Sequence, residues 1–371
     1  MYSYEKELQM LVEQNCGGQD RTAQDSPFLS GLSGKTVMLS GATGMIGKYM
    51  IDFLMCCNDS RVFEAPVHII ALSRSEACAR KRLARHFGKN TFRYTACDVS
   101  REIPECGQAD YVIHAASNTH PLQYAQDSVG TIATNILGTK NLLDYAVSHG
   151  TQRFCFLSSV EIYGENRGDT VRFDEGYLGY LDCNTLRAGY PEGKRAGEAL
   201  CNAYAQTYQL DFVIPRLSRV YGPTMLHSDT KAISQFIKKA AAGEDIVLKS
   251  AGTQLYSYVY AADAVTGILT VLLRGETGEA YNISDTESEV TLRRIAEWLA
   301  EDHGVQVVYE IPDAVEQKGY STATKALLDT GKAASLGFCP ATHMREGLLK
   351  TVSHLRARDG KTSAFEIFSL I

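Results

Sequence analysis

Three glycines that follow a short apolar run constrain the fold of this chain more than any other feature. Residues 35–40 have the pattern of a buried strand, and Gly41, Gly44 and Gly47 separate them from a helical pattern over 48–57. One glycine permits a tight turn, one lets backbone N–H groups reach a phosphate, and one lets helix and strand pack closely. The order strand, glycine turn, helix predicts a dinucleotide-binding unit.

Strand and helix patterns alternate along the rest of the chain. We expect further strands at residues 67–72, 92–99, 111–116, 154–159 and 211–216. We expect further helices at residues 135–143, 186–200, 232–241, 259–273 and 344–355. This alternation predicts the α/β class, with a Rossmann-like doubly wound parallel sheet and a smaller C-terminal substrate-binding domain.

The chain divides into three parts on these patterns. Residues 1–33 form an N-terminal extension with helical periodicity near its start, and the sequence leaves open whether it is a docking arm or a mobile tail. Residues 34–215 are assigned mainly to the NAD(P)-binding domain and 216–371 mainly to the substrate-binding domain. A segment at 255–285 is expected to return to the first domain.

Composition places the chain among ordinary globular enzymes. The net charge of −6 argues against nucleic acid or a membrane surface as a partner, because such proteins are usually basic. No signal peptide opens the sequence and no apolar run reaches the length of a membrane span, so we expect a cytoplasmic location. The ten cysteines show no zinc-ligand spacing, and no metal is expected; Cys56, Cys57 and Cys155 read as buried thiols.

The end of the second predicted strand bears on the choice of nucleotide. An acidic residue there accepts from the ribose hydroxyl of NAD, whereas an arginine accommodates the extra phosphate of NADP. Ser73 and Arg74 stand at this point, followed by Arg80 and Lys81. The cofactor is therefore NAD or NADP, with NADP slightly favoured, and the alternative is a solvated basic start of a helix.

A tyrosine and a lysine four residues apart lie on one face of the helix predicted over 186–200. An ammonium from Lys194 would favour the phenolate of Tyr190 and lower its pKa from about 10 towards the range of a general base. The spacing alone is common, and a pair on the helix surface is the alternative interpretation.

Several segments together resemble the extended short-chain dehydrogenase/reductases, the NAD-dependent epimerase/dehydratase family. The Gly-x-x-Gly-x-x-Gly spacing and the Tyr-x-x-x-Lys pair are typical of that superfamily. Residues 114–121, 187–195 and 229–244 are most similar to UDP-glucuronate decarboxylases. The resemblance implies a nucleotide-diphosphate sugar as substrate and a cofactor that is retained and recycled.

The resemblance also implies roles for particular residues. Tyr190 would be the base at the C4 hydroxyl, Lys194 would hold the nicotinamide ribose, and Ser159 would hydrogen-bond the reacting oxygen. The residues implied at the cofactor are Gly41, Thr43, Gly44, Met45, Ile46, Gly47, Ser73, Arg74, Asp98, Val99, Ala115, Ala116, Ser117, Asn135, Tyr190 and Lys194. Those implied at the substrate are Ser117, Asn118, Glu161, Arg187, Arg219, Lys231 and Tyr256.

Different reactions remain open after C4 oxidation. The family's 4,6-dehydratases have Asp-Glu after the Ser/Thr, whereas this chain has Val160 and Glu161. The missing acid counts against dehydration, and the retained glutamate favours decarboxylation over plain 4-epimerisation, unless Glu161 is only structural. A non-catalytic NADP-binding regulator and a reductase that releases its cofactor are the further alternatives.

Two substitutions depart from the family pattern. Tyr256 stands where most members have an arginine that clamps the diphosphate, and Arg219 stands where they have an asparagine. We expect Arg219 to supply the missing guanidinium to a phosphate or carboxylate. The alternative is a surface arginine paired with an acid. The family's C-terminal segment at the diphosphate is rich in arginine, whereas the corresponding part of this chain has only Lys325 and Lys332, near Asp329.

The resemblance finally implies a homodimer that pairs the Tyr/Lys helix and its neighbour across a two-fold axis. Ala196, Gly197 and Ala199 would allow the helices to approach closely there.

Overall fold

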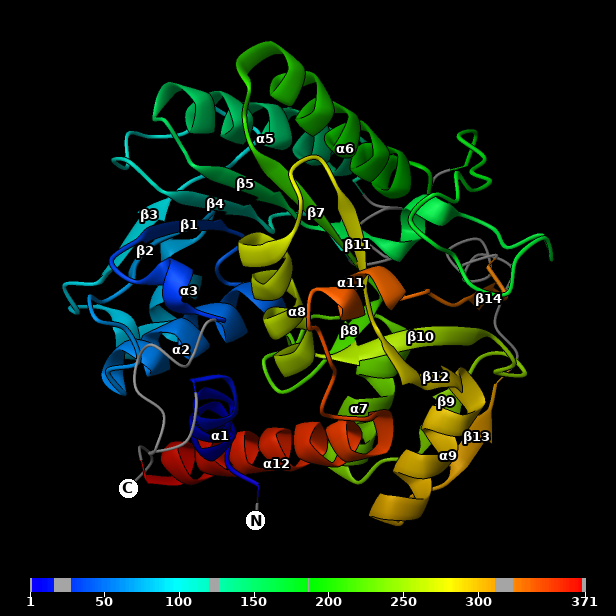
Figure 1. Cartoon of the computed structure of the whole chain (residues 1–371). Coiled ribbons are helices and arrows are strands. Elements are labelled where there is room, and N and C mark those ends of the chain that lie inside the picture. Colours follow the sequence, from blue (N-terminus) through cyan, green and yellow to red (C-terminus); the bar gives the residue numbers. More distant parts are fainter. Residues whose placement is uncertain (1, 17–27, 120–126, 186, 311–322, 369–371) are drawn as a thin grey trace.

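A parallel sheet of eight strands forms the larger part of the computed structural model, which describes residues 2–16, 28–119, 127–185, 187–310 and 323–368 (Figure 1). The strand order is β11-β7-β5-β4-β1-β2-β3, with β6 beside β7, and every pairing is parallel. The strands are β1 (Thr36–Ser40), β2 (His68–Ser73), β3 (Phe92–Ala96), β4 (Tyr111–His114), β5 (Arg153–Phe156), β6 (Ser158–Ser159), β7 (Phe212–Leu217) and β11 (Ala280–Ile283). The predicted fold class is confirmed.

Helices cover both faces of this sheet (Figure 1). Helices α5 (Ser128–Ser148) and α6 (Gly189–Tyr208) lie on one face, and α2 (Met45–Asp59) and α8 (Ala261–Arg274) lie on the other. Short helices at α3 (Glu76–Arg82), η2 (Ser30–Leu32), η3 (Ala84–His86) and η4 (Val160–Tyr163) complete this part. Parallel strands buried between two helical layers explain the continuous apolar runs in the sequence.

A second group of elements packs beside the large sheet. Its four-stranded sheet contains β8 (Arg219–Tyr221), β10 (Leu255–Tyr260), β12 (Asp285–Thr291) and β14 (Lys325–Ala326), and a two-stranded sheet joins β9 (Ile246–Leu248) to β13 (Val307–Tyr309). Its helices are α7 (Ala232–Ala242), α9 (Leu292–His303), α11 (Gly331–Ser335) and α12 (Met344–Phe368).

The elements of the C-terminal half can be compared with their expected bounds. Within the segment at 255–285, which was expected to return to the NAD(P)-binding domain, α8 and β11 pack with the large sheet, whereas β10 pairs in the second sheet. The helix expected from residue 259 begins at Ala261, because Tyr260 has extended backbone angles (φ −71°, ψ 148°) and ends β10. The last helix also continues past residue 355, to Phe368.

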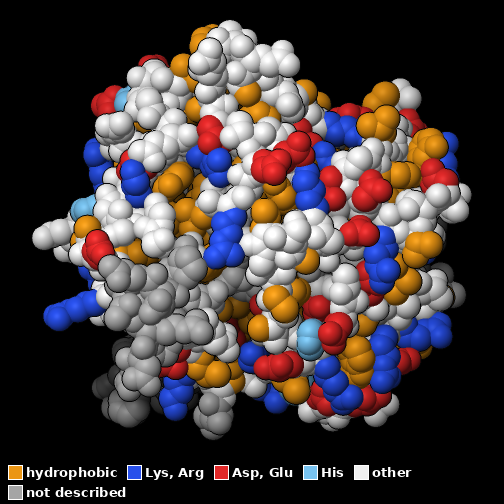
Figure 2. Space-filling view, in the orientation of Figure 1, with side chains coloured by type: hydrophobic (Ala, Val, Ile, Leu, Met, Phe, Trp, Pro, Cys, Tyr) orange, Lys and Arg blue, Asp and Glu red, His pale blue; other side chains and the backbone are white. Residues whose placement is uncertain are grey.

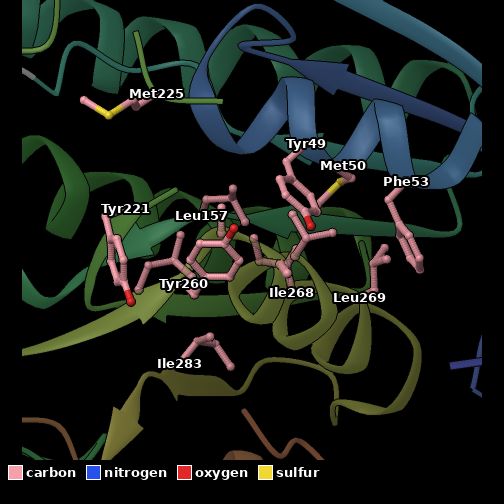
Figure 3. Packing of buried hydrophobic residues seen from close by; sticks show 14 of the residues in the cluster. Tyr49, Met50, Phe53, Leu157, Tyr221, Met225, Tyr260, Ile268, Leu269 and Ile283 are labelled. Atoms are coloured by element: carbon pink, nitrogen blue, oxygen red, sulfur yellow. The ribbon is translucent and has the colours of Figure 1, made fainter. Parts of the chain in front are cut away.

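The core between α2, α8 and the sheet is built from large side chains (Figure 3). Tyr49 and Phe53 of α2 face Ile268 and Leu269 of α8, and all four are buried. Burial of such side chains contributes roughly 1.5–3 kcal/mol each. Among the cysteines expected inside, Cys57 and Cys155 are buried, but Cys56 is only half-buried, with its thiol 3.8 Å from the Gln9 side chain.

The surface gives no sign of a basic binding stripe on the face shown in Figure 2, where acidic and basic side chains are intermixed. Within the described part of the chain, none of the helices combines the length and the apolar character that crossing a membrane requires.

Helix α1 (Tyr4–Cys16) is a packed part of the structure, which answers the question that the sequence left open for residues 4–16. Its Leu8 is 1% exposed and lies in the main hydrophobic core. Tyr4 donates a hydrogen bond to Asp52 of α2 at 2.8 Å. Glu7 accepts from Tyr49 of α2 at 2.7 Å and from Tyr260 at 2.9 Å. The linker at 17–27 lies outside the described residues.

We expect Leu8→Ala to lower the free energy of unfolding by about 2–5 kcal/mol, because it leaves a cavity in the core. Met10→Ala, at an exposed position of the same helix, is the matched control and should change stability by less than about 0.5 kcal/mol. Urea unfolding followed by fluorescence measures both. Equal effects of the two substitutions would show that α1 does not belong to the cooperative core.

Candidate active site

The glycine turn forms a cradle at the carboxyl end of β1. Gly41 has φ of 73°, and a Cβ placed there would lie 2.8 Å from the backbone of Ala115 and Ala116. A Cβ on Gly47 would lie 2.3 Å from the Gly41 carbonyl oxygen. Gly44 is the N-cap of α2 and provides no capping side chain, so the first-turn N–H groups of α2 are left for an anion to bind. These residues fit the pyrophosphate of a dinucleotide, and Thr43, Met45 and Ile46 lie in the same partly buried turn.

The neighbouring strand ends carry the residues expected at the adenosine half. Ser73 is buried, whereas Arg74 is exposed beyond the end of β2. The Asp98 carboxylate accepts from the Ser100 N–H and hydroxyl at 3.1 and 2.7 Å. Partial burial raises the pKa of Asp98, but these hydrogen bonds and the charge of Arg74 outweigh it and hold the pKa below its ordinary value. Val99 is buried against Gly138 of α5.

A buried hydrogen-bond network fixes the loop after β4. His114 bonds Ser40 of β1 at 2.8 Å and Thr139 of α5 at 3.1 Å. Burial holds the pKa of His114 well below its ordinary value, so this imidazole is neutral. The Ala116 N–H in turn donates to the Ser40 hydroxyl at 3.2 Å.

The next residues of that loop turn towards α5. Ser117 donates to the Asn135 side chain at 2.8 Å, and Asn118 is buried. These hydrogen bonds hold the loop after β4 and helix α5 next to the carboxyl end of β1. Residues 120–121 of the segment that resembled the decarboxylases lie outside the described residues.

Helix α6 approaches α5 and the sheet closely at two glycines. A Cβ on Gly193 would lie 2.7 Å from Asn135, and one on Gly197 would lie 2.3 Å from the Phe156 ring. Gly197 therefore faces the interior, and its expected place in a helix interface between two protomers is wrong. Ala199 is exposed on the outer side of α6.

Lys194 of α6 carries a buried ammonium group, and the residue is only 3% exposed. Its Nζ donates to the Leu157 carbonyl at 2.8 Å and lies 4.8 Å from the centre of the Phe156 ring. Burial lowers its pKa to about 8, although the Glu198 carboxylate acts in the opposite direction. Below this pKa, and therefore at neutral pH, Lys194 keeps its positive charge.

Tyr190 lies one turn before Lys194 and is hydrogen-bonded to Ser159. Burial raises the pKa of Tyr190 to about 12; the Ser159 hydrogen bond lowers it and the Glu161 charge raises it. The expected lowering of this pKa by Lys194 is not found in the protein by itself, because removal of the phenolate from water is the larger effect. Tyr190 consequently holds its proton at rest, while Ser159, Tyr190 and Lys194 still meet as predicted.

Glu161 lies beside this triad, between two arginines. The Ser159 hydroxyl accepts from the Glu161 N–H at 3.3 Å, which starts the turn η4. The Glu161 carboxylate lies 3.7 Å from Arg187 and 3.6 Å from Arg219, on separate oxygens. Val160 is buried and belongs to the main hydrophobic core.

Arg219 and Tyr256, the two residues expected to depart from the family pattern, are in contact. The Arg219 guanidinium lies over the Tyr256 ring, 3.5 Å from its centre. Lys231 instead pairs with Asp229 at 3.0 Å, so the structure ties it to its own helix start. Lys332 pairs with Glu279 rather than with Asp329, and Lys325 lies in β14.

Sequence reasoning missed the groups that hold the triad in place. Glu198 lies one turn after Lys194 and receives two hydrogen bonds from Arg216 of β7, at 3.1 and 2.7 Å. The Leu157 carbonyl and the Phe156 ring contact the Lys194 ammonium directly. The four-residue spacing of Lys194 and Glu198 could have predicted that these two side chains lie close together on α6. The Leu157 carbonyl could not be predicted as a partner of Lys194, because every residue has a backbone carbonyl.

These features define a class of protein: a dinucleotide cradle next to a Ser/Tyr/Lys group at the carboxyl ends of parallel strands is the site of a dinucleotide-dependent enzyme. The model of the NAD dependent epimerase/dehydratase family matches residues 37–284. The chain belongs to that family, whose members are enzymes.

Individual relatives agree with this assignment. UDP-glucuronic acid decarboxylase 6 of Arabidopsis thaliana is 29% identical over 333 residues, which cover 88% of this chain and 91% of the relative. UDP-glucuronic acid decarboxylase 1 of Xenopus tropicalis is 28% identical over 333 residues, covering 89% and 74%. Among solved structures, DesIV of Streptomyces venezuelae, a dTDP-glucose 4,6-dehydratase with NAD and TYD bound, is 26% identical with a TM-score of 0.75, covering 88% and 98%.

The buried Lys194 makes stability depend on pH. Its pKa falls from 10.5 in the ordinary lysine to about 8 in the folded protein, so the unfolded chain binds more protons between these values. Stability from this group therefore rises as pH increases from 8 to 10.5. We expect urea unfolding to show the wild type gaining about 3 kcal/mol relative to Lys194→Met across this window. Parallel pH curves for the two proteins would contradict the prediction.

Proposed function

We propose that this protein modifies a nucleotide-diphosphate sugar by oxidation at C4, and that its reaction is the decarboxylation of a UDP-hexuronate such as UDP-glucuronate. The observation that carries the proposal is the meeting of Ser159, Tyr190 and Lys194 beside Glu161 and the glycine cradle. The names of the curated relatives and their coverage of most of the chain support it.

The residues divide the work of proton transfer. Tyr190 first loses its own proton to solvent, and the phenolate then takes the proton of the C4 hydroxyl as the C4 hydride leaves. Ser159 donates to the oxygen that becomes a ketone. Lys194, on the same helix face, supplies the positive charge that offsets the burial of the phenolate. A bound nicotinamide ring would accept the hydride and return it at the end, so no external oxidant is consumed.

The C4 ketone weakens the bond from C5 to a C6 carboxylate, as in any β-keto acid. Carbon dioxide leaves, the electron pair remains as an enolate, and C5 then takes a proton. Val160 offers no acid to expel a hydroxide from C6, which argues against dehydration. A plain 4-epimerase would need no carboxylate at position 161, and a non-catalytic regulator would need neither Tyr190 nor Lys194.

A homodimer is part of the proposal. Val129, Ile132 and Leu137 of α5 are exposed apolar side chains, and α5 lies next to α6. A shared apolar surface on these two helices is the arrangement that this pattern favours. We also propose a cytoplasmic location, on the composition of the chain.

NAD is the cofactor that the family description names, and Arg74 keeps NADP as the alternative. Fluorescence titration of the apoprotein with each nucleotide decides between them. We expect NAD to bind at least as tightly as NADP, because Arg74 is exposed and its charge is partly offset by Asp98. If NADP binds tenfold more tightly, and Arg74→Ala removes the difference, the NADP expectation from the sequence holds instead.

The reaction is tested by incubating the protein and NAD with UDP-glucuronate, UDP-glucose, UDP-galactose and dTDP-glucose, followed by NMR and mass spectrometry. We expect carbon dioxide and a UDP-pentose from UDP-glucuronate. Tyr190→Phe should lower the rate by about 10²–10⁴-fold, because proton transfer is lost. Arg345→Gln, at an exposed ion pair, is the control and should react like the wild type.

Other products lead to other conclusions. Isomers of unchanged mass would identify an epimerase, and loss of water would identify a dehydratase. No product from any of these sugars, with NAD tightly bound, would favour the non-catalytic regulator, and net release of NADH would favour a simple reductase.

A further inference from the structure

Arg219 is held rigidly but is not fully satisfied. Its guanidinium stacks on Tyr256, whose hydroxyl is itself fixed by a 2.6 Å hydrogen bond to the Ala323 carbonyl. The Arg219 Nη1 atom is buried and has no hydrogen-bond partner among the described residues. A buried, charged N–H group without an acceptor is costly, and it indicates a place where a ligand atom completes the site.

Glu161 does not fill that role. Its carboxylate is 3.6 Å from Arg219 and 3.7 Å from Arg187, distances that give attraction but exceed a normal hydrogen bond. Two guanidiniums and one carboxylate leave this group of three side chains with a net charge of +1. A monoanion brings the group to neutrality, whereas a neutral hydroxymethyl group leaves the excess charge in place.

The position of the group indicates which anion it meets. Glu161 follows Ser159 by two residues, and Ser159 is hydrogen-bonded to Tyr190, the proposed base at C4. The three charged side chains thus border the reacting end of the sugar. The diphosphate is attached to C1, at the opposite end, so an anion on the C5 side of the ring fits this position better.

We propose that Arg219, stacked on Tyr256 and aided by Arg187, binds the C6 carboxylate of a hexuronate and selects it over neutral hexoses. The inference rests on the proposed function and names the specificity residue of the same site. Arg219 offers two parallel N–H groups, which match a carboxylate. Tyr256 acts through Arg219 as a positioning residue, because its ring fixes the plane of the guanidinium.

The test compares ligands that differ only at C6. Isothermal titration calorimetry with NAD present measures UDP-glucuronate, UDP-glucose and UDP-xylose in a Tyr190→Phe background, which blocks turnover. We expect UDP-glucuronate to bind about tenfold or more tighter than the two neutral sugars. Arg219→Gln should weaken UDP-glucuronate about 10–100-fold, the range for one charged hydrogen-bonding group, and the neutral sugars by less than about threefold.

Two further variants separate positioning from charge. Tyr256→Leu should weaken UDP-glucuronate about three- to tenfold and leave the neutral sugars unchanged, because the guanidinium loses its stacking surface but not its charge. Arg172→Gln, which removes an exposed arginine paired with Glu289, is the matched control and should affect no ligand. In the background with Tyr190 restored, Arg219→Gln should raise KM for the uronate more than it lowers kcat.

The outcomes distinguish this inference from the proposed function. Equal weakening of all three ligands by Arg219→Gln would place the guanidinium on the shared diphosphate and overturn the inference alone. Equal affinity of the unsubstituted Arg219 protein for charged and neutral sugars would also overturn it, even if Arg219→Gln failed to fold. Failure to bind any of the three UDP sugars would overturn the proposed function, and the inference with it.

Discussion

The close approach of α6 to α5 and to β5 fixes the positions of Ser159, Tyr190 and Lys194 relative to one another. Gly193 and Gly197 leave no side chain between the helices and the sheet, so Asn135 and the Phe156 ring occupy that space. The same approach brings the Lys194 ammonium onto the Leu157 carbonyl and removes it from water. The Arg216–Glu198 pair then anchors the helix to β7. Close packing of α6 against these neighbours leaves the side chains of Tyr190 and Lys194 little freedom to shift.

Local patterns in the sequence were enough to predict the large sheet and the triad. The glycine spacing and the four-residue spacing of Tyr190 and Lys194 each report on a single turn of structure, which neighbouring residues determine. The direction of the Tyr190 pKa could not be predicted in this way, because it depends on how much water the packed helix excludes. The contact between Arg219 and Tyr256 joins β8 to β10, and the packing of α1 joins both ends of the chain. Such distant contacts leave no periodic signal.

The site combines two kinds of buried charge. Lys194 is enclosed by the Leu157 carbonyl and the Phe156 ring. Arg219 of β8 instead stacks on the Tyr256 ring of the neighbouring strand β10. Under the proposed function, the chemistry at C4 and the recognition at C6 would be carried by different elements, and substitution at β8 and β10 would change the second without disturbing the first.

The packing of α1 has a consequence for how the chain folds. Helix α1 contacts Tyr49 of α2, Tyr260 at the end of β10 and, at 3.9 Å, Lys350 of α12. Its apolar side chains Leu8, Leu11 and Val12 are buried in this arrangement. Because contacts of long sequence separation form slowly, we expect the contacts of α1 with β10 and α12 to lag behind its contact with α2 during folding.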